Sequence, residues 1–220
     1  MSDQKKLILF DIDHTLFNTR LYQSLCYLKI FELSGLHDSE SFLKACDEIY
    51  KELRRNGPFT LTQFIDRLFG QFTISVDKKE IEKIFADENI IEQALYDDAE
   101  KVLQLFSTKE NTQLGIFSAG SSYLQKAKIN SLLHLFQEEH IHINDVDKID
   151  DIPKLLEQYQ EGEIYVVDDL MNVLYSLKSS INSVTTILIE RAGETKREPM
   201  NDFTPDYTIV SLNELVTIIK

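Results

Sequence analysis

Cysteine is scarce in this chain, and its two cysteines are not arranged as a disulfide framework would be. Cys26 and Cys46 both lie within stretches whose apolar residues recur at helical spacing, where a cysteine usually serves as a small buried hydrophobic residue. Small secreted domains, by contrast, depend on several cross-linked cysteines. We therefore expect two reduced thiols in a cytoplasmic protein.

Long apolar runs are also missing. A membrane-spanning helix needs roughly 20 consecutive apolar residues, and no part of the chain approaches that length. Lys5 and Lys6 precede only four apolar residues, Leu7 to Phe10, before Asp11 interrupts them, which is too short for the core of a signal peptide. The sequence thus predicts neither a membrane span nor a secretory signal.

Basic residues are few compared with acidic ones, because 23 Lys and Arg stand against 37 Asp and Glu, a formal charge of -14. Such a surface repels the phosphate backbone of nucleic acids and anionic lipid headgroups. Nucleic-acid polymers and membranes are therefore not expected as partners, and no feature of the sequence identifies a protein partner. A small anionic substrate is compatible with this charge, because a few cations or a bound metal ion set the local field of a pocket.

The apolar residues that are present form five short runs typical of buried strands. They lie at residues 7–10, 113–117, 140–143, 164–167 and 184–189. Most are continuously apolar, as expected for parallel strands covered by helices on both faces. Helix-period apolar positions occur at residues 98–107, 121–136, 149–159 and 171–180. This alternation predicts an α/β fold with a doubly wound, Rossmann-like parallel sheet.

A long helical insertion is expected between the first two strands, where a single crossover helix would need far fewer residues. Its helical segments lie near residues 21–31, 42–53, 62–69 and 79–85, and the second is ended by Asn56-Gly57-Pro58. We predict a core domain of residues 1–17 and 96–220 and a helical domain of residues 18–95. Asp97 and Asp98 precede the next helix, where they are expected to cap its N-terminus.

Acidic pairs follow two of the predicted strands. Asp11 and Asp13 follow the first strand, and Asp168 and Asp169 end the fourth, with Asn172 one turn later. Ligands bind at the carboxyl ends of strands in open α/β sheets, and buried carboxylates there need a partner such as a metal ion. We therefore expect both pairs to face one crevice.

Two further segments are expected at the same edge. The second strand ends in Ser118, Ala119 and Gly120, a short hydroxyl followed by small residues that let backbone N–H groups approach an anion. Lys148 opens the predicted helix before the fourth strand. Each signal is weak alone, but their arrangement on successive strands of one sheet strengthens them together.

Four segments of the chain resemble the four motifs of the haloacid dehalogenase (HAD) superfamily. In chain order they are Asp11-x-Asp13-x-Thr15, Ser118, Lys148 and Asp168-Asp169. The helical insertion resembles the cap that this superfamily carries after its first motif, and residues 205–215 resemble its closing segment. The resemblance covers nearly the whole chain and implies a HAD-type core with an α-helical cap domain.

The resemblance also implies an activity, that of a Mg²⁺-dependent phosphatase acting on a small phosphorylated metabolite. Asp11 would attack phosphorus and form an aspartyl-phosphate intermediate, for which an ionised carboxylate needs no activating base. Asp13 would protonate the leaving oxygen and then deprotonate the attacking water.

The same resemblance implies which residues bind the metal and the phosphate. Magnesium would be held by Asp11, the backbone carbonyl of Asp13 and Asp168, with Asp169 nearby, and would offset the repulsion between Asp11 and the phosphate. The implied phosphate-binding residues are Thr15, which also braces the loop, Ser118, Ala119, Gly120 and Lys148.

Three positions leave alternatives open. His14 occupies a slot where the family most often has Gly, so local packing or substrate contacts can differ. Asp168 is favoured over Asp169 as the main metal ligand because of its spacing to Asn172. Lys148 is favoured over Lys154 because it precedes the predicted helix, whereas Lys154 lies inside it.

Other functions are compatible with parts of the pattern. A phosphomutase of the same superfamily and a non-catalytic phosphometabolite-binding or regulatory protein are the main alternatives. Dehalogenation is disfavoured because it would not require the acid that Asp13 offers. Cleavage of a phosphonate would need a Schiff-base lysine from the insertion, and no lysine there stands out.

Overall fold

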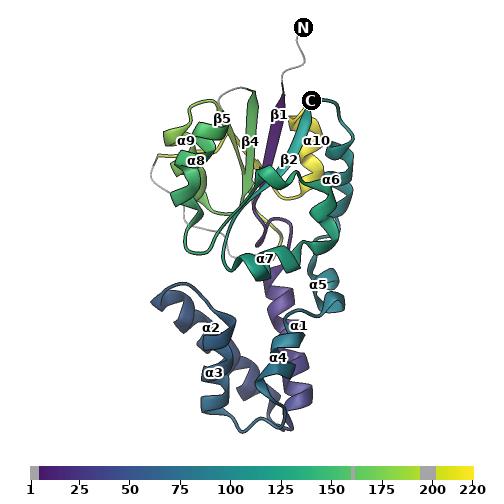
Figure 1. The fold of residues 1–220 in the computed structure, drawn as a ribbon, viewed down its shortest axis with the longest axis vertical. Coiled ribbons are helices and arrows are strands. Elements are labelled where there is room, and N and C mark those ends of the chain that lie inside the picture. The colour runs from purple at the N-terminus through teal and green to yellow at the C-terminus, as the bar shows by residue number, and fades with distance from the viewer. Residues whose placement is uncertain (1–4, 160–161, 194–201) are drawn as a thin grey trace. The chain divides into compact units, whose positions relative to one another are not determined.

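The structure is a computed structural model that describes residues 5–159, 162–193 and 202–220 (Figure 1). A six-stranded parallel sheet with the order β3-β2-β1-β4-β5-β6 forms its centre. The strands are β1 (Lys6–Phe10), β2 (Thr112–Ala119), β3 (Ile141–Asn144), β4 (Glu163–Asp168), β5 (Val184–Ile189) and β6 (Tyr207–Ile209). The predicted α/β fold with a parallel sheet is confirmed, and β6 adds a short edge strand to the five that were predicted.

Helices cover both faces of the sheet (Figure 1). Those of the core are α6 (Ala99–Ser107), α7 (Ser122–Lys128), α8 (Ile152–Gln158), α9 (Met171–Ser180) and α10 (Leu215–Ile218). Leu7 and Leu9 of β1 pack in a buried cluster with residues of α8 and α9, while Ile8 and Phe10 are fully buried on the opposite face. The strand is apolar throughout because both of its faces are covered.

Two predicted helices are shorter than expected. The segment 121–136 is helical only to Lys128 and continues as the 3-10 helix η1 (Asn130–Leu135), because Asn130 and Ser131 favour an α-helix poorly. The segment 149–159 begins as the 3-10 helix η3 (Lys148–Asp151), and α8 starts only at Ile152. Pro153 lies in the first turn of α8, the position in a helix that tolerates a residue without an N–H.

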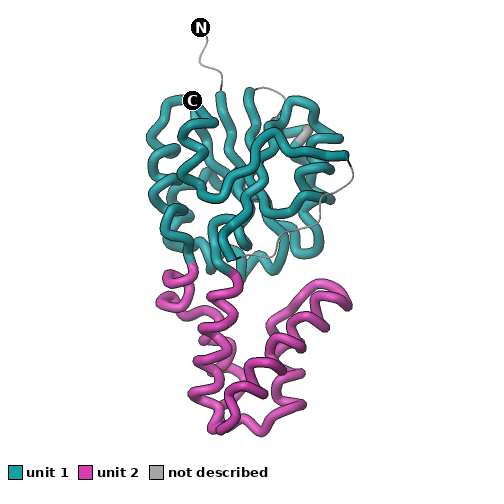
Figure 2. The backbone as a smooth tube through the Cα atoms, turned by 180° about the vertical axis from the view of Figure 1, so that it is seen from behind, with its two compact units in different colours: residues 1–18, 95–220 teal, residues 19–94 magenta. Residues whose placement is uncertain are grey.

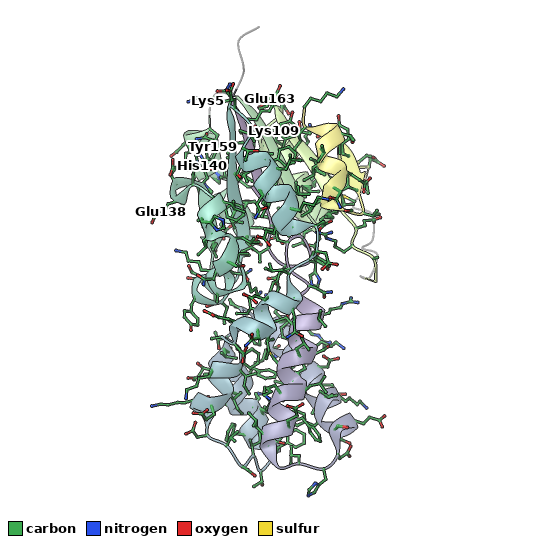
Figure 3. All side chains as sticks on the ribbon, turned by 90° about the vertical axis from the view of Figure 1, so that its right-hand side faces the viewer. Lys5, Lys109, Glu138, His140, Tyr159 and Glu163 are labelled. Atoms are coloured by element: carbon green, nitrogen blue, oxygen red, sulfur yellow. The ribbon has the colours of Figure 1, made fainter. Side chains whose placement is uncertain are left out.

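Tyr159 connects the end of α8 to the edge of the sheet. Its hydroxyl lies 2.6 Å from Nδ1 of His140 and 3.1 Å from Nε2 of His142 (Figure 3 labels Tyr159 and His140). One hydroxyl can donate to one imidazole and accept from the other. This shared contact ties the helix that follows Lys148 to β3 and its preceding turn.

The chain divides into two compact units (Figure 2). Unit 1 comprises residues 1–18 and 95–220, and unit 2 comprises residues 19–94. All helices of unit 2 lie between β1 and β2, as the predicted insertion requires. They are α1 (Thr19–Ser34), α2 (Ser39–Asn56), α3 (Leu61–Gln71), α4 (Lys78–Ile84) and α5 (Glu88–Ala94), of which α5 was not predicted.

Aromatic side chains form much of the interior of unit 2. Tyr27 stacks on Phe64 with ring centroids 5.5 Å apart, and Phe42 meets Phe72 at 5.2 Å. Contacts of this geometry add stability beyond the area that the rings bury. Among the described residues, no helix combines the length and the apolar character needed to cross a membrane.

Candidate active site

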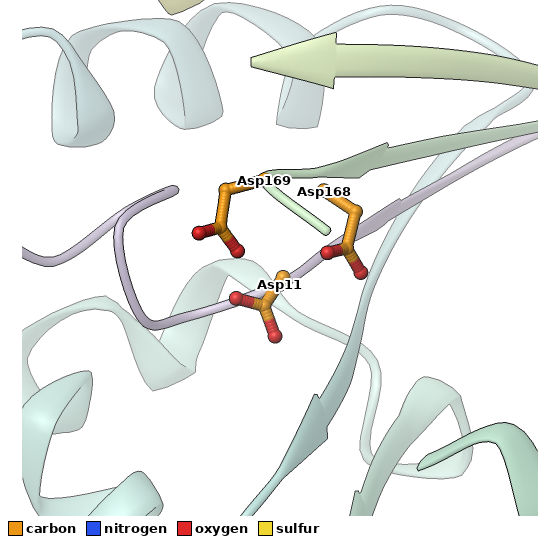
Figure 4. Close-up of side chains that lie close together, drawn as sticks. All are labelled: Asp11, Asp168 and Asp169. Atoms are coloured by element: carbon orange, nitrogen blue, oxygen red, sulfur yellow. The ribbon is translucent and has the colours of Figure 1, made fainter. Parts of the chain in front are cut away.

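Three buried carboxylates meet at the carboxyl ends of two neighbouring strands (Figure 4). Asp11 follows β1, while Asp168 ends β4 and Asp169 follows it. Phe10 of β1 pairs with Val167 of β4. The backbone N–H of Asp11, the next residue, donates to the Val167 carbonyl at 2.9 Å. This register places one oxygen of each carboxylate within 4.8 Å of the others.

Lys148 lies between two of these carboxylates. Its Nζ is 2.5 Å from Oδ1 of Asp11 and 2.6 Å from Oδ2 of Asp168. Burial by itself would lower the pKa of this amine, but the charges of Asp11 and Asp168 outweigh burial and raise its pKa above the ordinary value. Lys148 is therefore a buried cation that neutralises part of the cluster.

Lys154 lies elsewhere. It pairs with Asp151 at 2.5 Å, and its side chain is 73% exposed. Of the two lysines considered from the sequence, the structure brings Lys148 and not Lys154 to the carboxylates.

The cluster retains an excess of negative charge. Burial raises the pKa of Asp168 to about 6, with Asp11 adding to the rise and Lys148 opposing it. Three carboxylates and one lysine leave charge that a divalent cation would offset, and carboxylate oxygens at this spacing are the ligands that Mg²⁺ takes. The donor set therefore fits a magnesium ion.

The loop after β1 turns sharply over three residues. The Ile12 carbonyl accepts hydrogen bonds from the backbone N–H groups of Leu16 at 3.0 Å and Phe17 at 2.9 Å. His14 has a φ of 61°, in the left-handed region, where a side chain costs roughly 1–2 kcal/mol. This conformation explains why glycine suits the same slot in the family that the sequence resembles.

Asp13 is held by two side chains that the sequence analysis did not select. Nζ of Lys128 lies 2.6 Å from Oδ1 of Asp13, and Nε2 of Gln125 lies 2.9 Å from Oδ2. Both residues belong to α7 and are buried. The two residues are three positions apart, so they lie on one face of the helix that follows the strand ending near Ser118. This spacing is the sequence signal by which they could have been found.

The segment Ser118–Gly120 lies at the same edge of the sheet, at the end of β2. The Ser118 hydroxyl accepts a hydrogen bond from Nε2 of Gln125 at 3.0 Å. Gly120 has a φ of 125°, and its N–H donates to the Asn144 carbonyl at 2.8 Å. Because this N–H already has a hydrogen-bond partner within the protein, the role that the structure gives Gly120 is to allow the turn after β2.

The expected capping role of Asp98 is wrong. Asp98 precedes α6 but makes no side-chain capping bond; its Oδ2 instead lies 2.7 Å from Nη1 of Arg191. The same oxygen accepts from the Ser211 hydroxyl at 2.7 Å and the Leu212 N–H at 2.9 Å. Tertiary partners that are distant in the sequence have replaced the local cap.

Arg191 also reaches the loop that carries Thr15. Its Nη2 and Nε donate to the Thr15 carbonyl at 2.6 and 3.2 Å, and its guanidinium lies 4.0 Å from the centroid of the Tyr96 ring. The Thr15 backbone is thereby tied to Asp98. The sequence analysis did not identify Arg191, because nothing in its local pattern distinguishes it from a surface arginine.

Comparison with solved structures gives the fold. The chain is similar over 98% of its length, and 97% of the other chain, to a protein from Burkholderia xenovorans LB400 proposed to be a haloacid dehalogenase-like hydrolase, with 17% identity and a TM-score of 0.76. YfnB from Bacillus subtilis, a proposed HAD-hydrolase bound to magnesium, matches with 16% identity and a TM-score of 0.70 over 99% of this chain and 100% of its own.

Both phosphatases and dehalogenases share this fold. A HAD phosphatase from Thermococcus onnurineus matches with 21% identity and a TM-score of 0.61 over 97% of each chain, and L-2-haloacid dehalogenases match with TM-scores of 0.64. No protein-family model and no curated protein sequence matches the chain. The chain has a HAD-like fold with a helical insertion after its first strand.

Proposed function

We propose that this protein is a Mg²⁺-dependent phosphatase that hydrolyses a small phosphate monoester, with Asp11 as the nucleophile. One observation carries the proposal: Asp11, Asp168 and Asp169 converge within 4.8 Å in a buried cluster that also contains the cation of Lys148. A carboxylate beside a cation and a metal-ligand set has what attack on an anionic phosphate requires.

Magnesium would be held by Asp11, Asp168, Asp169 and the backbone carbonyl of Asp13. When bound, it would neutralise charge on the phosphate and on Asp11. An HAD-hydrolase bound to magnesium among the structural neighbours supports this assignment.

The reaction would proceed in two displacements. The Asp11 carboxylate attacks phosphorus while Asp13 gives a proton to the departing alkoxide, so that an alcohol leaves and an aspartyl phosphate forms. Asp13 then takes a proton from water, whose oxygen attacks phosphorus and releases phosphate from Asp11. Lys148 and the Ser118 hydroxyl would hold the transferring oxygens, with Thr15, Ala119 and Gly120 shaping the loops around them.

Asp13 favours a phosphatase over a dehalogenase, which shares the fold. Displacement of a halide requires no proton on the leaving group, whereas an alkoxide requires one. The Asp13 side chain is not one of the three carboxylates that meet within 4.8 Å, which supports a role as an acid distinct from the carboxylates that would hold the metal.

We also propose that the division of the chain serves this activity, with residues 1–17 and 96–220 as the catalytic core and residues 18–95 as a cap domain. An insertion of this size supports a small phosphorylated metabolite as the substrate, because a cap excludes water from a small site.

The proposal is tested by turnover of a panel of phosphate monoesters, including p-nitrophenyl phosphate, with magnesium and with EDTA. We expect magnesium-dependent release of phosphate that Asp11→Asn abolishes. The thermal melt should stay near that of wild type, because the buried Lys148 keeps Asp168 as its charged partner. The matched control is Asp150→Asn, an exposed acid that should retain activity. Halide release from a 2-haloacid without phosphate release would refute the proposal, and so would an active Asp11→Asn variant.

A further inference from the structure

We infer that Gln125 and Lys128 are positioning residues that orient the Asp13 carboxylate for proton transfer to the leaving group. This inference rests on the proposed function and assigns a role to α7 that the motifs do not contain. The hydrogen bonds of the two side chains run to Asp13, to the Ser118 segment and to each other, so their action on the reaction would pass through Asp13 or Ser118.

The two side chains hold both oxygens of Asp13. Lys128 donates to Oδ1 at 2.6 Å, and Gln125 donates to Oδ2 at 2.9 Å. A carboxylate held at one oxygen can rotate about its side-chain bonds, but one held at both oxygens has a defined plane. Each carboxyl oxygen has more than one lone pair, so Asp13 can carry the proton for the leaving group on a lone pair that Lys128 and Gln125 do not use. The plane of the carboxyl then sets where that proton points, and the acid must lie within hydrogen-bond distance of the leaving oxygen.

Lys128 also determines which way the Gln125 amide points. Nζ of Lys128 donates to Oε1 of Gln125 at 2.7 Å, so the Nε2 end of that amide must face the opposite way. There it meets Asp13, the Ser118 hydroxyl at 3.0 Å and the Ala119 carbonyl at 2.8 Å. One lysine thereby orients the amide that joins Asp13 to the Ser118 segment.

The burial of this pair distinguishes it from ordinary surface contacts. Gln125 is 2% exposed and Lys128 is 9% exposed, and the ammonium lies 5.5 Å from the centroid of the Phe17 ring. Charged and amide groups are costly to bury unless they are well paired. Both polar ends converge on Asp13, so their burial maintains a fixed geometry at that residue.

The consequence is a loss that depends on the leaving group. Displacing a reacting group by about 1 Å can cost on the order of a hundredfold in rate. An alkyl phosphate needs a proton from Asp13 as its alkoxide departs, whereas p-nitrophenolate is a weak base that leaves without one. Disorienting Asp13 should therefore slow the first substrate far more than the second.

The experiment compares kcat/KM for n-butyl phosphate and p-nitrophenyl phosphate, with magnesium, in wild type, Lys128→Met and Gln125→Met. We expect each variant to lose on the order of a hundredfold on the alkyl ester and less than about tenfold on the aryl ester. Lys128→Arg should recover part of the alkyl activity, because it restores a cation near Oδ1. Lys126→Met, an exposed lysine on the same helix, is the matched control and should behave as wild type.

A double variant separates positioning from general damage to the fold. In the Asp13→Asn background, Lys128→Met should cause no further loss on the alkyl ester, because residues that act as one unit are not additive. If Lys128→Met does not fold, Gln125→Met carries the same comparison. Equal losses on the two esters, or additive losses in the double variant, would overturn this inference alone. A wild-type protein that hydrolyses neither ester would overturn the proposed function itself.

Discussion

Replacing Arg191 with Met tests whether a buried ion pair holds the loop that carries Thr15. The side chains of Arg191 and Asp98 are 6% and 10% exposed, and they meet at 2.7 Å. Methionine keeps an apolar side chain of similar reach but removes the guanidinium. The variant thus loses its hydrogen bonds to the Thr15 carbonyl and leaves Asp98 without its buried cation.

The expected loss of stability is about 3 kcal/mol. Removing one partner of a buried pair costs roughly 3–5 kcal/mol because the other charge stays buried. The lower end applies here, because the Ser211 hydroxyl and the Leu212 N–H still donate to the same Asp98 oxygen. At about 2–4 °C per kcal/mol for a chain of this length, the melting temperature should fall by roughly 6–12 °C.

The dependence on pH follows from the pKa of Asp98. Burial by itself would raise that pKa, but the hydrogen bonds and charge from Arg191, with the bond from Ser211, hold it below the ordinary value of 3.8. A carboxyl whose pKa is lower in the folded state contributes stability that is fully present above the unfolded pKa and is lost as the pH falls through the folded pKa. The difference between Arg191→Met and wild type should thus be full at pH 7 and shrink below about pH 4.

Urea unfolding followed by circular dichroism, at pH 7 and below about pH 4, measures the difference in unfolding free energy between Arg191→Met and wild type. The control is Arg67→Met, which breaks an ion pair with Glu52 whose side chains are 53% and 49% exposed and which should change the unfolding free energy by about 0–1 kcal/mol. A loss from Arg191→Met of less than about 1 kcal/mol at pH 7, or one that does not shrink in acid, would refute the reasoning.

Two further predictions concern the core and the candidate site. In Gly115→Ala, the added Cβ would lie 2.5 Å from the His140 carbonyl oxygen and 2.7 Å from Cδ2 of Leu9. The free energy of unfolding, measured by urea titration, should therefore fall by about 1–3 kcal/mol. An unchanged urea midpoint would contradict this prediction, because it would mean that the neighbouring atoms make room for the methyl group at little cost. Lys148→Met should lower magnesium-dependent turnover by on the order of 10²–10³-fold, whereas the turnover of Lys154→Met should stay within about threefold of wild type. A larger loss from Lys154→Met than from Lys148→Met would assign the phosphate contact to Lys154 instead.

The strands and the main helices were predictable because each leaves a local pattern. Residues 184–189 form β5 over the predicted range, and 171–180 form α9, since an apolar run or a helical repeat reflects burial on a known face. The short α5 and the three residues of β6 were not predicted. Elements of this length contain too few turns or alternations to show a period.

The meeting of Asp11, Lys148 and Asp168 was also open to prediction, because parallel strands end at one edge of a sheet. The fate of Asp98 was not. Its position before a helix predicts a cap, and only the folded chain brings Arg191 and Ser211 close enough to compete for its carboxylate.

The sequence alone thus determined the fold class, the place of the insertion and the group of acidic and basic residues at one sheet edge, because all of these follow from periodicity and chain order. The tertiary structure decided which side chains hold that group in place: Lys128 and Gln125 at Asp13, and Arg191 at Thr15. Such pairings depend on distances between segments far apart in the chain, and local patterns carry no information about those distances.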